Sequence, residues 1–231
     1  MQTKTQNKGL EVIDGRTQLI VPHKGRELTF IYQSKQKGSF INVRNALENQ
    51  NLSMPTASQI TSLVYSAFQE DNKCSKEIIK LMKSNWLWGN SGILWTPKGV
   101  YIQDEPSIVN ERVKMSEGEL KNNIEKKIVR FVPYGFKIGK QSTLELSKNG
   151  FIRALVGEQG AYKLAEIADK HKRKPYLHGF EKVGNPIQGV ASLDSIWFVN
   201  ALGVYGDRGL GKNGCAFGVL KETSKAGLQK N

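Results

Sequence analysis

Strand-like segments alternate irregularly with helical segments along this chain of 231 residues, and their order restricts the fold most. The turn residues 22–26 separate strand-like stretches at 18–21 and 28–33, and Pro97-Lys98-Gly99 separates those at 93–96 and 100–103. Both arrangements predict β-hairpins. Because helices interrupt the hairpins at uneven intervals, we expect an α+β fold with short-stranded mixed or antiparallel sheets rather than regular βαβ winding.

About four helices are expected from apolar periodicity and capping signals. The clearest one follows Pro55, which ends any helix arriving from upstream. Thr56 caps the new helix and Gln59 stands at the capping-box position, three residues later. Residues 40–43 are ambiguous between strand and helix. Three other helices are expected. One begins at Ser75, one begins at Ser116, and the last covers roughly residues 158–171.

The chain length fits one medium domain. We expect a flexible N-terminal arm over residues 1–16, a single α+β domain over 17–222, and a frayed tail over 223–231. Residues 134–150 are where the domain could subdivide. Near its end, stretches 195–199 and 216–220 are expected to pair as strands around a glycine-rich loop.

The chain carries 34 Lys and Arg against 21 Asp and Glu, a formal net charge of +13. This surplus favours an anionic partner, such as nucleic acid, an acidic protein or a lipid headgroup surface, although solubility explains it nearly as well. The densest patch is Lys170-His171-Lys172-Arg173-Lys174. It fits a nucleic-acid patch, but the solvated end of a helix is the favoured interpretation because cations complement the helix dipole there.

Two cysteines, Cys74 and Cys215, are too few for a disulfide framework, which indicates a reducing compartment. The polar start of the chain lacks the apolar stretch of a secretory signal. No stretch is long and apolar enough to span a bilayer. We therefore expect a soluble, cytoplasmic protein without a membrane span, and we expect Cys74 at its surface.

The glycine-rich segment 203–214 contains two patterns found in phosphate-binding loops. One ends in Gly211-Lys212 but lacks the Ser or Thr that would hold Mg²⁺, and a G-x-G-x-x-G pattern begins at Gly209. Both need a helix to follow, whereas the next residues are strand-like. A mobile hairpin loop is therefore favoured over a nucleotide site, although Arg208 and Lys212 on such a loop could still contact an anion.

Residues for catalysis or metal binding form no coherent set. The three histidines do not stand at zinc-ligand spacing, and there is no C-x-x-C. Asp104 and Glu105 are neighbours at a strand end, where they would point to opposite faces as solvated acids. Gly89-Asn90-Ser91-Gly92 is not a G-x-S-x-G elbow and reads as a turn. We expect no metal and no cofactor, and we assign no catalytic residue.

Four aromatic residues, Trp86, Trp88, Trp95 and Tyr101, lie within sixteen positions. Such side chains form a core or line a recognition surface for sugars, bases or peptides. If the stretch is extended, Trp86 and Trp88 share one face. The large area that each ring must bury favours the core.

Three segments together resemble a known family: Leu52-Ser53-Met54-Pro55-Thr56-Ala57-Ser58-Gln59-Ile60, the tryptophan-rich stretch from Trp86 to Trp95, and Val129-Arg130-Phe131-Val132-Pro133. They are similar to the "L-P-T-x-x-E" helix entry, the tryptophan-rich segment and the closing "V-R-x-V" strand of C-type-lectin-like domains of the formylglycine-generating and bacterial-lipoprotein type. The resemblance covers about residues 52–133.

The sequence also departs from that pattern. Met54 replaces the usual leucine, and no acidic residue follows the Pro-Thr pair. The calcium-type carboxylates and the catalytic cysteine pair of the formylglycine enzymes have no counterpart here. The resemblance therefore implies a scaffold that displays a ligand-binding surface without the enzyme's chemistry.

We accordingly expect a non-enzymatic recognition module with basic surface loops and an anionic or protein partner. Two alternatives remain open. One is a nucleic-acid-binding protein that uses the basic patch, and the other is a nucleotide-binding enzyme built on residues 206–214. The oligomeric state is not determined by the sequence. The expected contact residues are, in order, Arg208, Lys212, Lys172, Arg173 and Lys174.

Overall fold

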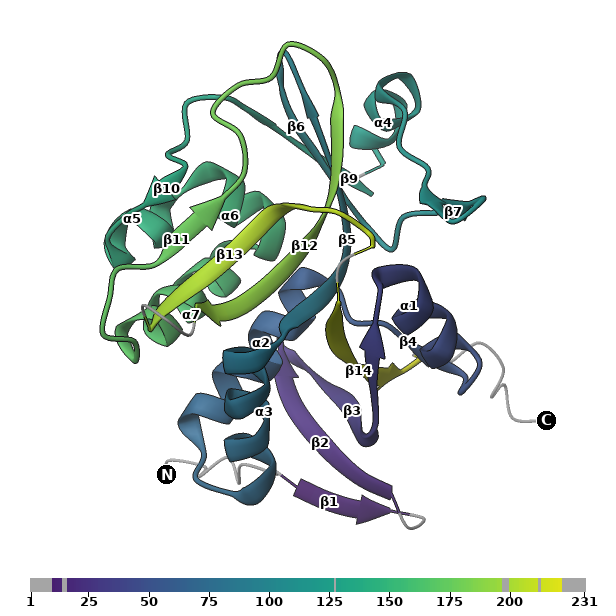
Figure 1. The fold of residues 1–231 in the computed structure, drawn as a ribbon, viewed down its shortest axis with the longest axis vertical. Coiled ribbons are helices and arrows are strands. Elements are labelled where there is room, and N and C mark those ends of the chain that lie inside the picture. Colours follow the sequence, from purple (N-terminus) through teal and green to yellow (C-terminus); the bar gives the residue numbers. More distant parts are fainter. Residues whose placement is uncertain (1–9, 14–15, 127, 197–199, 212, 222–231) are drawn as a thin grey trace, which may run out of the picture.

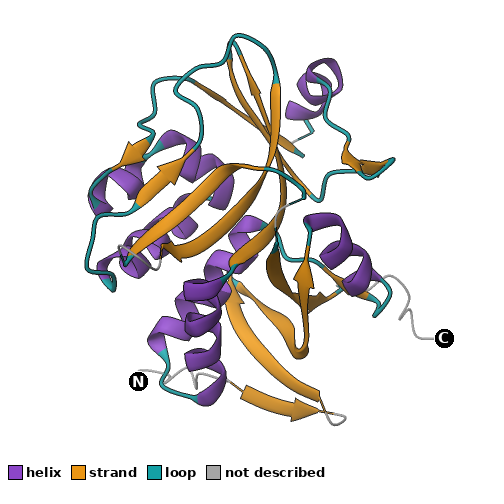
Figure 2. Ribbon diagram, in the orientation of Figure 1, coloured by secondary structure: helices purple, strands orange, loops and turns teal. Residues whose placement is uncertain are grey.

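The computed structural model describes residues 10–13, 16–126, 128–196, 200–211 and 213–221. Within them, seven helices pack around a twelve-stranded mixed sheet, and two further strands form a small separate ribbon (Figures 1 and 2). The predicted α+β class is confirmed. The helices in this part of the chain exceed the expected four because residues 40–48, 143–148 and 150–156 are also helical.

The helices are α1 (Phe40–Glu48), α2 (Ala57–Gln69), α3 (Lys73–Ser84), α4 (Glu117–Ile124), α5 (Thr143–Lys148), α6 (Gly150–Val156) and α7 (Glu158–Asp169). The strands are β1 (Leu10–Ile13), β2 (Arg16–His23), β3 (Arg26–Gly38), β4 (Leu52–Ser53), β5 (Trp86–Thr96), β6 (Gly99–Asp104), β7 (Ile108–Val109), β8 (Arg112–Val113), β9 (Val129–Pro133), β10 (Gly139–Lys140), β11 (Tyr176–His178), β12 (Ile187–Ile196), β13 (Ala201–Arg208) and β14 (Gly214–Leu220).

Strand order in the large sheet is β1-β2-β3-β14-β5-β12-β13-β11-β10, with β4 beside β14 and with β6 joining β5 to β9. The two predicted hairpins are present as β2–β3 and β5–β6. The predicted pairing of 195–199 with 216–220 is wrong. β12 pairs with β5 and β13, while β14 pairs with β3, β4 and, in parallel, β5. Residues 197–199 lie outside the described part of the chain.

The segment 203–208, expected to begin a mobile glycine-rich loop, instead forms the last six residues of β13. Its glycines permit close packing. The carbonyl of Gly206 accepts a hydrogen bond from the indole Nε1 of Trp95 at 2.9 Å. A Cβ added at Gly206 would lie 2.6 Å from the ring of Phe151. The glycine pattern at this end of the segment therefore reflects a tight fit of sheet against core, and a strand, β14, follows it.

Two apolar clusters lie on the two faces of the sheet, as the two-residue period of β5 dictates. Leu87 and Trp95 face a cluster shared with α2, α3, α6 and α7. Trp88 and Leu94 face a second cluster, to which α1 and α4 contribute. Trp88 and Trp95 are fully buried, so the core interpretation of these two tryptophans holds.

The Gly89–Gly92 segment, expected to be a turn, lies inside β5, where the pairing with β12 shifts register. The first residue of α2 contacts β5 at this irregularity. Ser91 Oγ accepts a hydrogen bond from the backbone N–H of Ala57 at 3.1 Å and donates one to Asp104 at 2.5 Å. The segment therefore anchors a helix N-terminus to the middle of the sheet. Asp104, expected to be a solvated acid, is also paired with Arg130 at 2.7 Å.

Helix starts follow the local capping chemistry. α2 begins with the predicted capping box of Thr56 and Gln59, and Ser116 caps α4 as expected. α3 begins before the predicted cap Ser75, because Asn72 accepts the hydrogen bond from the backbone N–H of Ser75. α7 covers most of the predicted 158–171 helix, and the ambiguous stretch 40–43 belongs to α1.

Cys74 and Cys215 are both buried and free, so the expected surface position of Cys74 is wrong. Burial raises the pKa of both thiols. Within the predicted N-terminal arm, Leu10–Ile13 forms β1 antiparallel to β2. Residues 1–9 and the predicted tail 223–231 lie outside the described residues. Among the described helices, none has the length and apolar character needed to cross a membrane.

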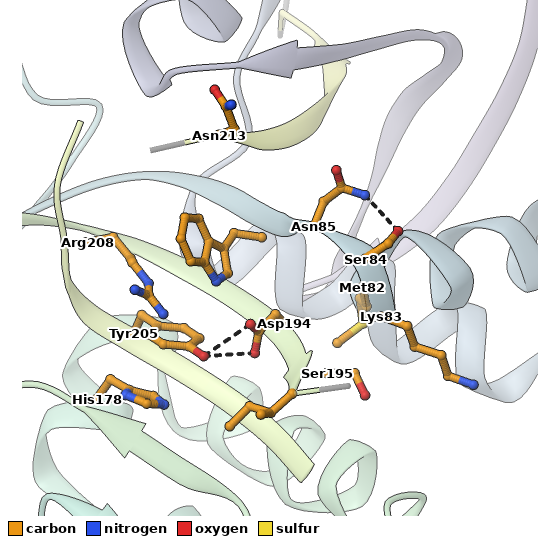
Figure 3. A pocket seen from close by; sticks show the side chains of 12 residues that line it. Met82, Lys83, Ser84, Asn85, His178, Asp194, Ser195, Tyr205, Arg208 and Asn213 are labelled. Carbon is orange, nitrogen blue, oxygen red and sulfur yellow. Dashed lines mark hydrogen bonds between the residues drawn. The ribbon is translucent and has the colours of Figure 1, made fainter. Parts of the chain in front are cut away.

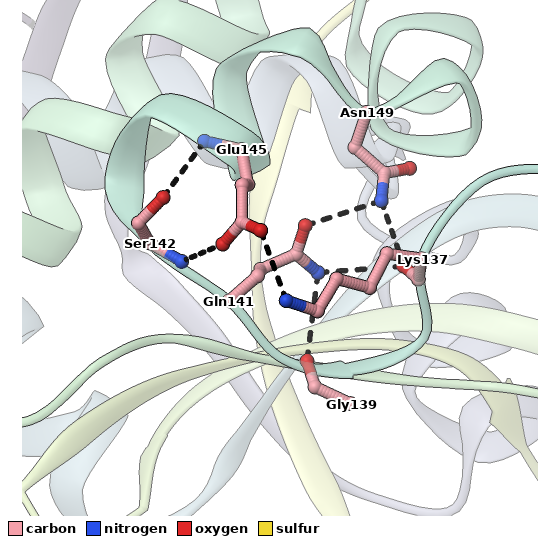
Figure 4. Close-up of polar contacts among 6 residues, drawn as sticks. All are labelled: Lys137, Gly139, Gln141, Ser142, Glu145 and Asn149. Atoms are coloured by element: carbon pink, nitrogen blue, oxygen red, sulfur yellow. Dashed lines mark hydrogen bonds and ion pairs between the residues drawn. The ribbon is translucent and has the colours of Figure 1, made fainter.

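A polar network organises the connection from β10 to α6 (Figure 4). Asn149 caps α6, because its Oδ1 accepts the backbone N–H groups of Phe151 and Ile152. Its amide nitrogen donates to the carbonyl of Lys137 at 2.8 Å and to Oε1 of buried Gln141 at 3.2 Å. The same side chain therefore orders the loop and the helix.

A second capping box starts α5 beside this network. The backbone N–H of Ser142 donates to Glu145 at 2.6 Å, and Lys137 pairs with the same carboxylate at 3.0 Å. The hydrogen bond from Ser142, followed by the one from Lys137, lowers the pKa of Glu145 to about 2. α5 thus lies within residues 134–150, the stretch where the sequence indicates that the domain could subdivide.

Replacing Asn149 by alanine is expected to lower the free energy of unfolding by about 2 kcal/mol. The change removes the acceptor for two N–H groups of α6 and leaves buried Gln141 without its donor. Denaturant unfolding followed by circular dichroism measures the loss. As a control, Leu144→Ala on the exposed side of α5 should cost less than about 0.5 kcal/mol. A loss for Asn149→Ala no larger than this control would contradict the capping role.

Candidate binding site around Arg208

A cavity of about 490 Å³ lies where the C-terminal end of α3 meets β5, β11, β12 and β13 (Figure 3). This volume falls within the range typical of pockets for small ligands. Its walls combine aromatic, charged and amide side chains. The residues used below are Lys83, Trp86, His178, Asp194, Tyr205 and Arg208.

Two aromatic rings flank the side chain of Arg208 at the end of β13. Its guanidinium carbon lies 3.7 Å from the ring centroid of Tyr205 and 4.0 Å from that of Trp86. His178 stacks against Tyr205 with ring centroids 4.0 Å apart and planes 12° apart. Figure 3 shows Arg208 and His178 on opposite sides of the Tyr205 ring. The planes of Trp86 and Tyr205 are 60° apart and their ring centroids are 6.4 Å apart, so the two rings flank the guanidinium at an angle to each other. Its hydrogen bonds to a ligand must be made through its N–H groups.

The charge of Arg208 has no ion-pair partner within 4.0 Å among the described residues. Its Nε is buried and has no hydrogen-bond acceptor there. The aromatic rings shield the group from water without neutralising it. A positively charged side chain is therefore fixed in one orientation and available to a ligand.

Asp194 lies in the same pocket on the neighbouring strand β12. The hydroxyl of Tyr205 lies 3.1 Å from both of its carboxylate oxygens and donates to them. Burial raises the pKa of Asp194 to about 6, although the Tyr205 hydroxyl, Arg208 and the Trp86 side chain oppose the shift. Burial and Arg208 lower the pKa of His178 to about 4. At neutral pH the pocket thus holds a neutral imidazole and a carboxylate that protonates readily.

The structure places the predicted contact residues in two separate regions. Arg208 ends a strand and lines the pocket, so its expected position on a flexible loop is wrong. Lys212 lies outside the described residues. Lys172, Arg173 and Lys174 are exposed in the connection between α7 and β11.

The exposed cations and Arg208 are not brought together. β11 runs parallel to β13, with Tyr176 opposite Gly203, so Lys174 is level with the start of β13. Arg208 stands at the far end of the same strand, about 23 Å away at ~3.3 Å per residue. The basic patch therefore does not contribute to the pocket.

Sequence reasoning missed four of the pocket residues: Trp86, His178, Asp194 and Tyr205. For Trp86 the sequence favours the core over a recognition surface, and it raises His178 only as a metal ligand. The four come from separate strands, and no local motif links them. The available signal was the mixed character of 201–208, where Tyr205 and Arg208 interrupt a glycine-rich strand.

A serine–histidine contact lies at the wall of the pocket, which Ser195 lines, and it connects two elements of the fold. His171 Nδ1 lies 2.9 Å from the Ile167 carbonyl, so this nitrogen carries the proton and donates it there. Nε2 then accepts the hydroxyl of Ser195 at 3.0 Å. Such a contact can activate a serine, but Ser195 is only 4% exposed. The pair instead ties β12 to the end of α7.

The residues that the structure describes contain no cluster of three His, Cys, Asp or Glu side chains suited to a metal ion. The pocket therefore offers charge, hydrogen bonds and ring edges to a ligand. These groups suit recognition of a polar or charged molecule.

Comparison with known proteins identifies the fold. No family model matches the sequence, and no curated protein matches it. The structure is similar to a solved one reported as "Accommodation of massive sequence variation in Nanoarchaeota by the C-type lectin fold", with a TM-score of 0.56 and 16% sequence identity. The match covers 80% of this chain and 96% of that one, so it extends well beyond the predicted segment 52–133. Over most of its length, therefore, the chain has a C-type-lectin-like fold.

Proposed function

We propose that the protein is a non-enzymatic recognition module that binds an anionic group of its ligand in the Arg208 pocket. The observation that carries this proposal is the guanidinium held between Trp86 and Tyr205 without an ion-pair partner in the described chain. The C-type-lectin-like fold supports a binding role. The partner is an anionic molecule or the acidic surface of a protein.

Three physical features favour anion binding at this position. A guanidinium presents parallel N–H groups that match a carboxylate or phosphate. The two rings hold it in place, so little side-chain entropy remains to be lost on binding. Partial burial weakens screening by water and salt, which strengthens the attraction to an incoming charge.

Three probes that share a benzene ring and differ in charge test this proposal: benzoate, benzamide and benzylammonium. We expect benzoate to shift the Arg208 Nε–H and Trp86 indole N–H resonances in ¹⁵N-correlated NMR spectra of the full chain. Benzamide should bind at least tenfold more weakly, and benzylammonium should produce no saturable shift, because it meets the guanidinium charge.

The matched variants are Arg208→Gln and Arg173→Gln. Each removes one positive charge, but only Arg208 lines the pocket. We expect Arg208→Gln to abolish the benzoate response of the Trp86 indole and Arg173→Gln to preserve it. Equal weakening in both variants, or tighter binding of benzylammonium than of benzoate, would reject an anion site at Arg208.

Nucleic acid is a second candidate partner, because three cationic side chains are exposed next to one another: Lys172, Arg173 and Lys174. Such binding would weaken steeply with salt, since counterions are released from the phosphate backbone. Filter binding of a DNA duplex at 50 and 200 mM salt tests it, with the triple Gln variant of the patch as the control. A flat salt response would remove this candidate.

We also propose that the protein works in the cytoplasm. The free thiols of Cys74 and Cys215 support a reducing compartment.

A further inference from the structure

We infer that the pocket takes a carboxylate group together with a proton, and that Asp194 is the residue that holds this proton against the ligand. This inference rests on the proposed function of the Arg208 pocket. It narrows the ligand from any anion to one that can share a hydrogen bond with a protonated carboxyl.

The pocket contains an acidic side chain and a cationic side chain that do not form an ion pair. Asp194 on β12 and Arg208 on β13 line one cavity, yet they form no ion pair within 4.0 Å. Tyr205 lies between them, with its ring under the guanidinium and its hydroxyl on the carboxylate. A ligand group that bridges the two would satisfy both.

Asp194 has hydrogen-bonding capacity left for such a group. A carboxylate offers about four acceptor positions, whereas the Tyr205 hydroxyl supplies one hydrogen to its two oxygens and the Trp86 side chain supplies one more. Once protonated, the carboxyl also becomes a donor. An O–H bond to a ligand oxygen would then complement the N–H edge of Arg208.

Every charged or titratable group among the described lining residues can be assigned a state between pH 5.5 and 8. Arg208 and, at the rim, Lys83 are cations. His178 is neutral because its pKa is about 4, and Tyr205 keeps its proton because burial raises its pKa. Asp194, whose pKa is about 6, changes its charge within this interval.

The sign of the pH effect follows from these states. At pH 8 an incoming carboxylate meets ionised Asp194, and the repulsion offsets part of the attraction to Arg208. At pH 5.5 most of Asp194 is protonated and donates a hydrogen bond to the ligand. Between these limits binding draws a proton from solution, so the affinity for a carboxylate must rise as the pH falls.

The test is calorimetric titration of benzoate into the full chain at pH 5.5, 7 and 8 and at constant ionic strength. Benzoate remains ionised throughout this interval. We expect about tenfold tighter binding at pH 5.5 than at pH 8. At pH 7, titrations in two buffers that differ in ionisation enthalpy should reveal uptake of a substantial fraction of one proton per benzoate. This measurement uses the wild-type chain and does not depend on the folding of any variant.

Two carboxyl variants locate the proton. Asp194→Asn should bind benzoate with the same affinity at pH 5.5 and 8, at least as tightly as the wild type does at pH 8, and without proton uptake. Asp207 is a matched control, because burial also raises its pKa beside Arg208 but it does not line the cavity. Asp207→Asn should keep the wild-type pH dependence.

The outcomes separate this inference from the proposed function. Benzoate binding that needs Arg208 but does not vary with pH, or that keeps its pH dependence in Asp194→Asn, overturns the proton-linked site and leaves the anion pocket intact. Affinity that increases with pH overturns it as well. If benzoate binds at none of the three pH values, both the inference and the anion pocket fall.

Discussion

Replacing Trp95 by alanine is expected to lower the free energy of unfolding by about 3–5 kcal/mol, the range found for large aromatic side chains removed from a core. Trp95 is fully buried. It stacks on Phe151 with ring centroids 5.2 Å apart and meets the edge of Phe180 at 5.5 Å. Its indole N–H donates to the carbonyl of Gly206, which the substitution would leave without that donor.

The size of the loss follows from how closely the surroundings fit the ring. Gly179 and Gly206 both approach the indole so closely that an added Cβ would lie 2.5 Å and 3.0 Å from its atoms. Backbone this close cannot collapse fully into the vacated space, so a cavity remains. Denaturant unfolding followed by far-ultraviolet circular dichroism measures the change.

Tyr162→Ala on the exposed face of α7 provides the control, because its side chain is half exposed. We expect it to change the free energy of unfolding by less than about 0.5 kcal/mol. If Trp95→Ala cost less than about 1 kcal/mol, the first apolar cluster would not depend on this ring.

Introducing valine at Gly89 should cost about 3 kcal/mol, at the upper end of the range for overpacked sites. An added Cβ would stand 2.9 Å from the backbone N and Cα of Ala57, the first residue of α2. Main-chain atoms at the start of a capped helix cannot move aside as a flexible side chain can. The whole N-terminus of α2 would have to shift, which would break the hydrogen bond from Ala57 to Ser91.

Gly118→Ala is the matched substitution at a glycine with space around it. No atom lies within 4 Å of a Cβ added there, and the residue is in α4. We expect this change to be neutral or to stabilise the protein by up to about 1 kcal/mol, because alanine favours the helix. Equal losses at the two glycines would show that Gly89 is not a point of close approach. The same denaturant unfolding experiment decides this.

Both substitutions bear on the binding site, because β5 connects the core to the pocket. Trp86 begins the strand and covers Arg208, while Trp95 near its other end anchors the strand against α6 and β13. The proposed site is therefore connected through β5 to the tightly packed core. We therefore expect the fixed orientation of the guanidinium to be a property of the free protein rather than a result of ligand binding.

Short-range signals were the reliable part of the sequence. The hairpins around residues 22–26 and 97–99 and the capping box of Thr56 with Gln59 depend on neighbours a few positions away, and the structure contains all of them. The similar signal of Ser142 with Glu145 marks α5 in the same way, but a six-residue helix lacks the apolar stripe that would draw attention to it.

The remaining features, the bulge in β5 and the pocket, depend on contacts between segments that are far apart in the sequence or lie on different strands. The residues around Gly89–Gly92 do not distinguish a bulge from a turn. The bulge forms because α2, from another part of the chain, packs against the strand there. Likewise, the sequence alone marked Arg208 as an anion contact from its charge and its glycine neighbours. Only the sheet, by placing β13 beside β12 and near the start of β5, brought Asp194 to it from the neighbouring strand and Trp86 from far along the chain. Side chains that meet through strand pairing have no fixed spacing in sequence, which is why the tertiary structure alone could assemble this pocket.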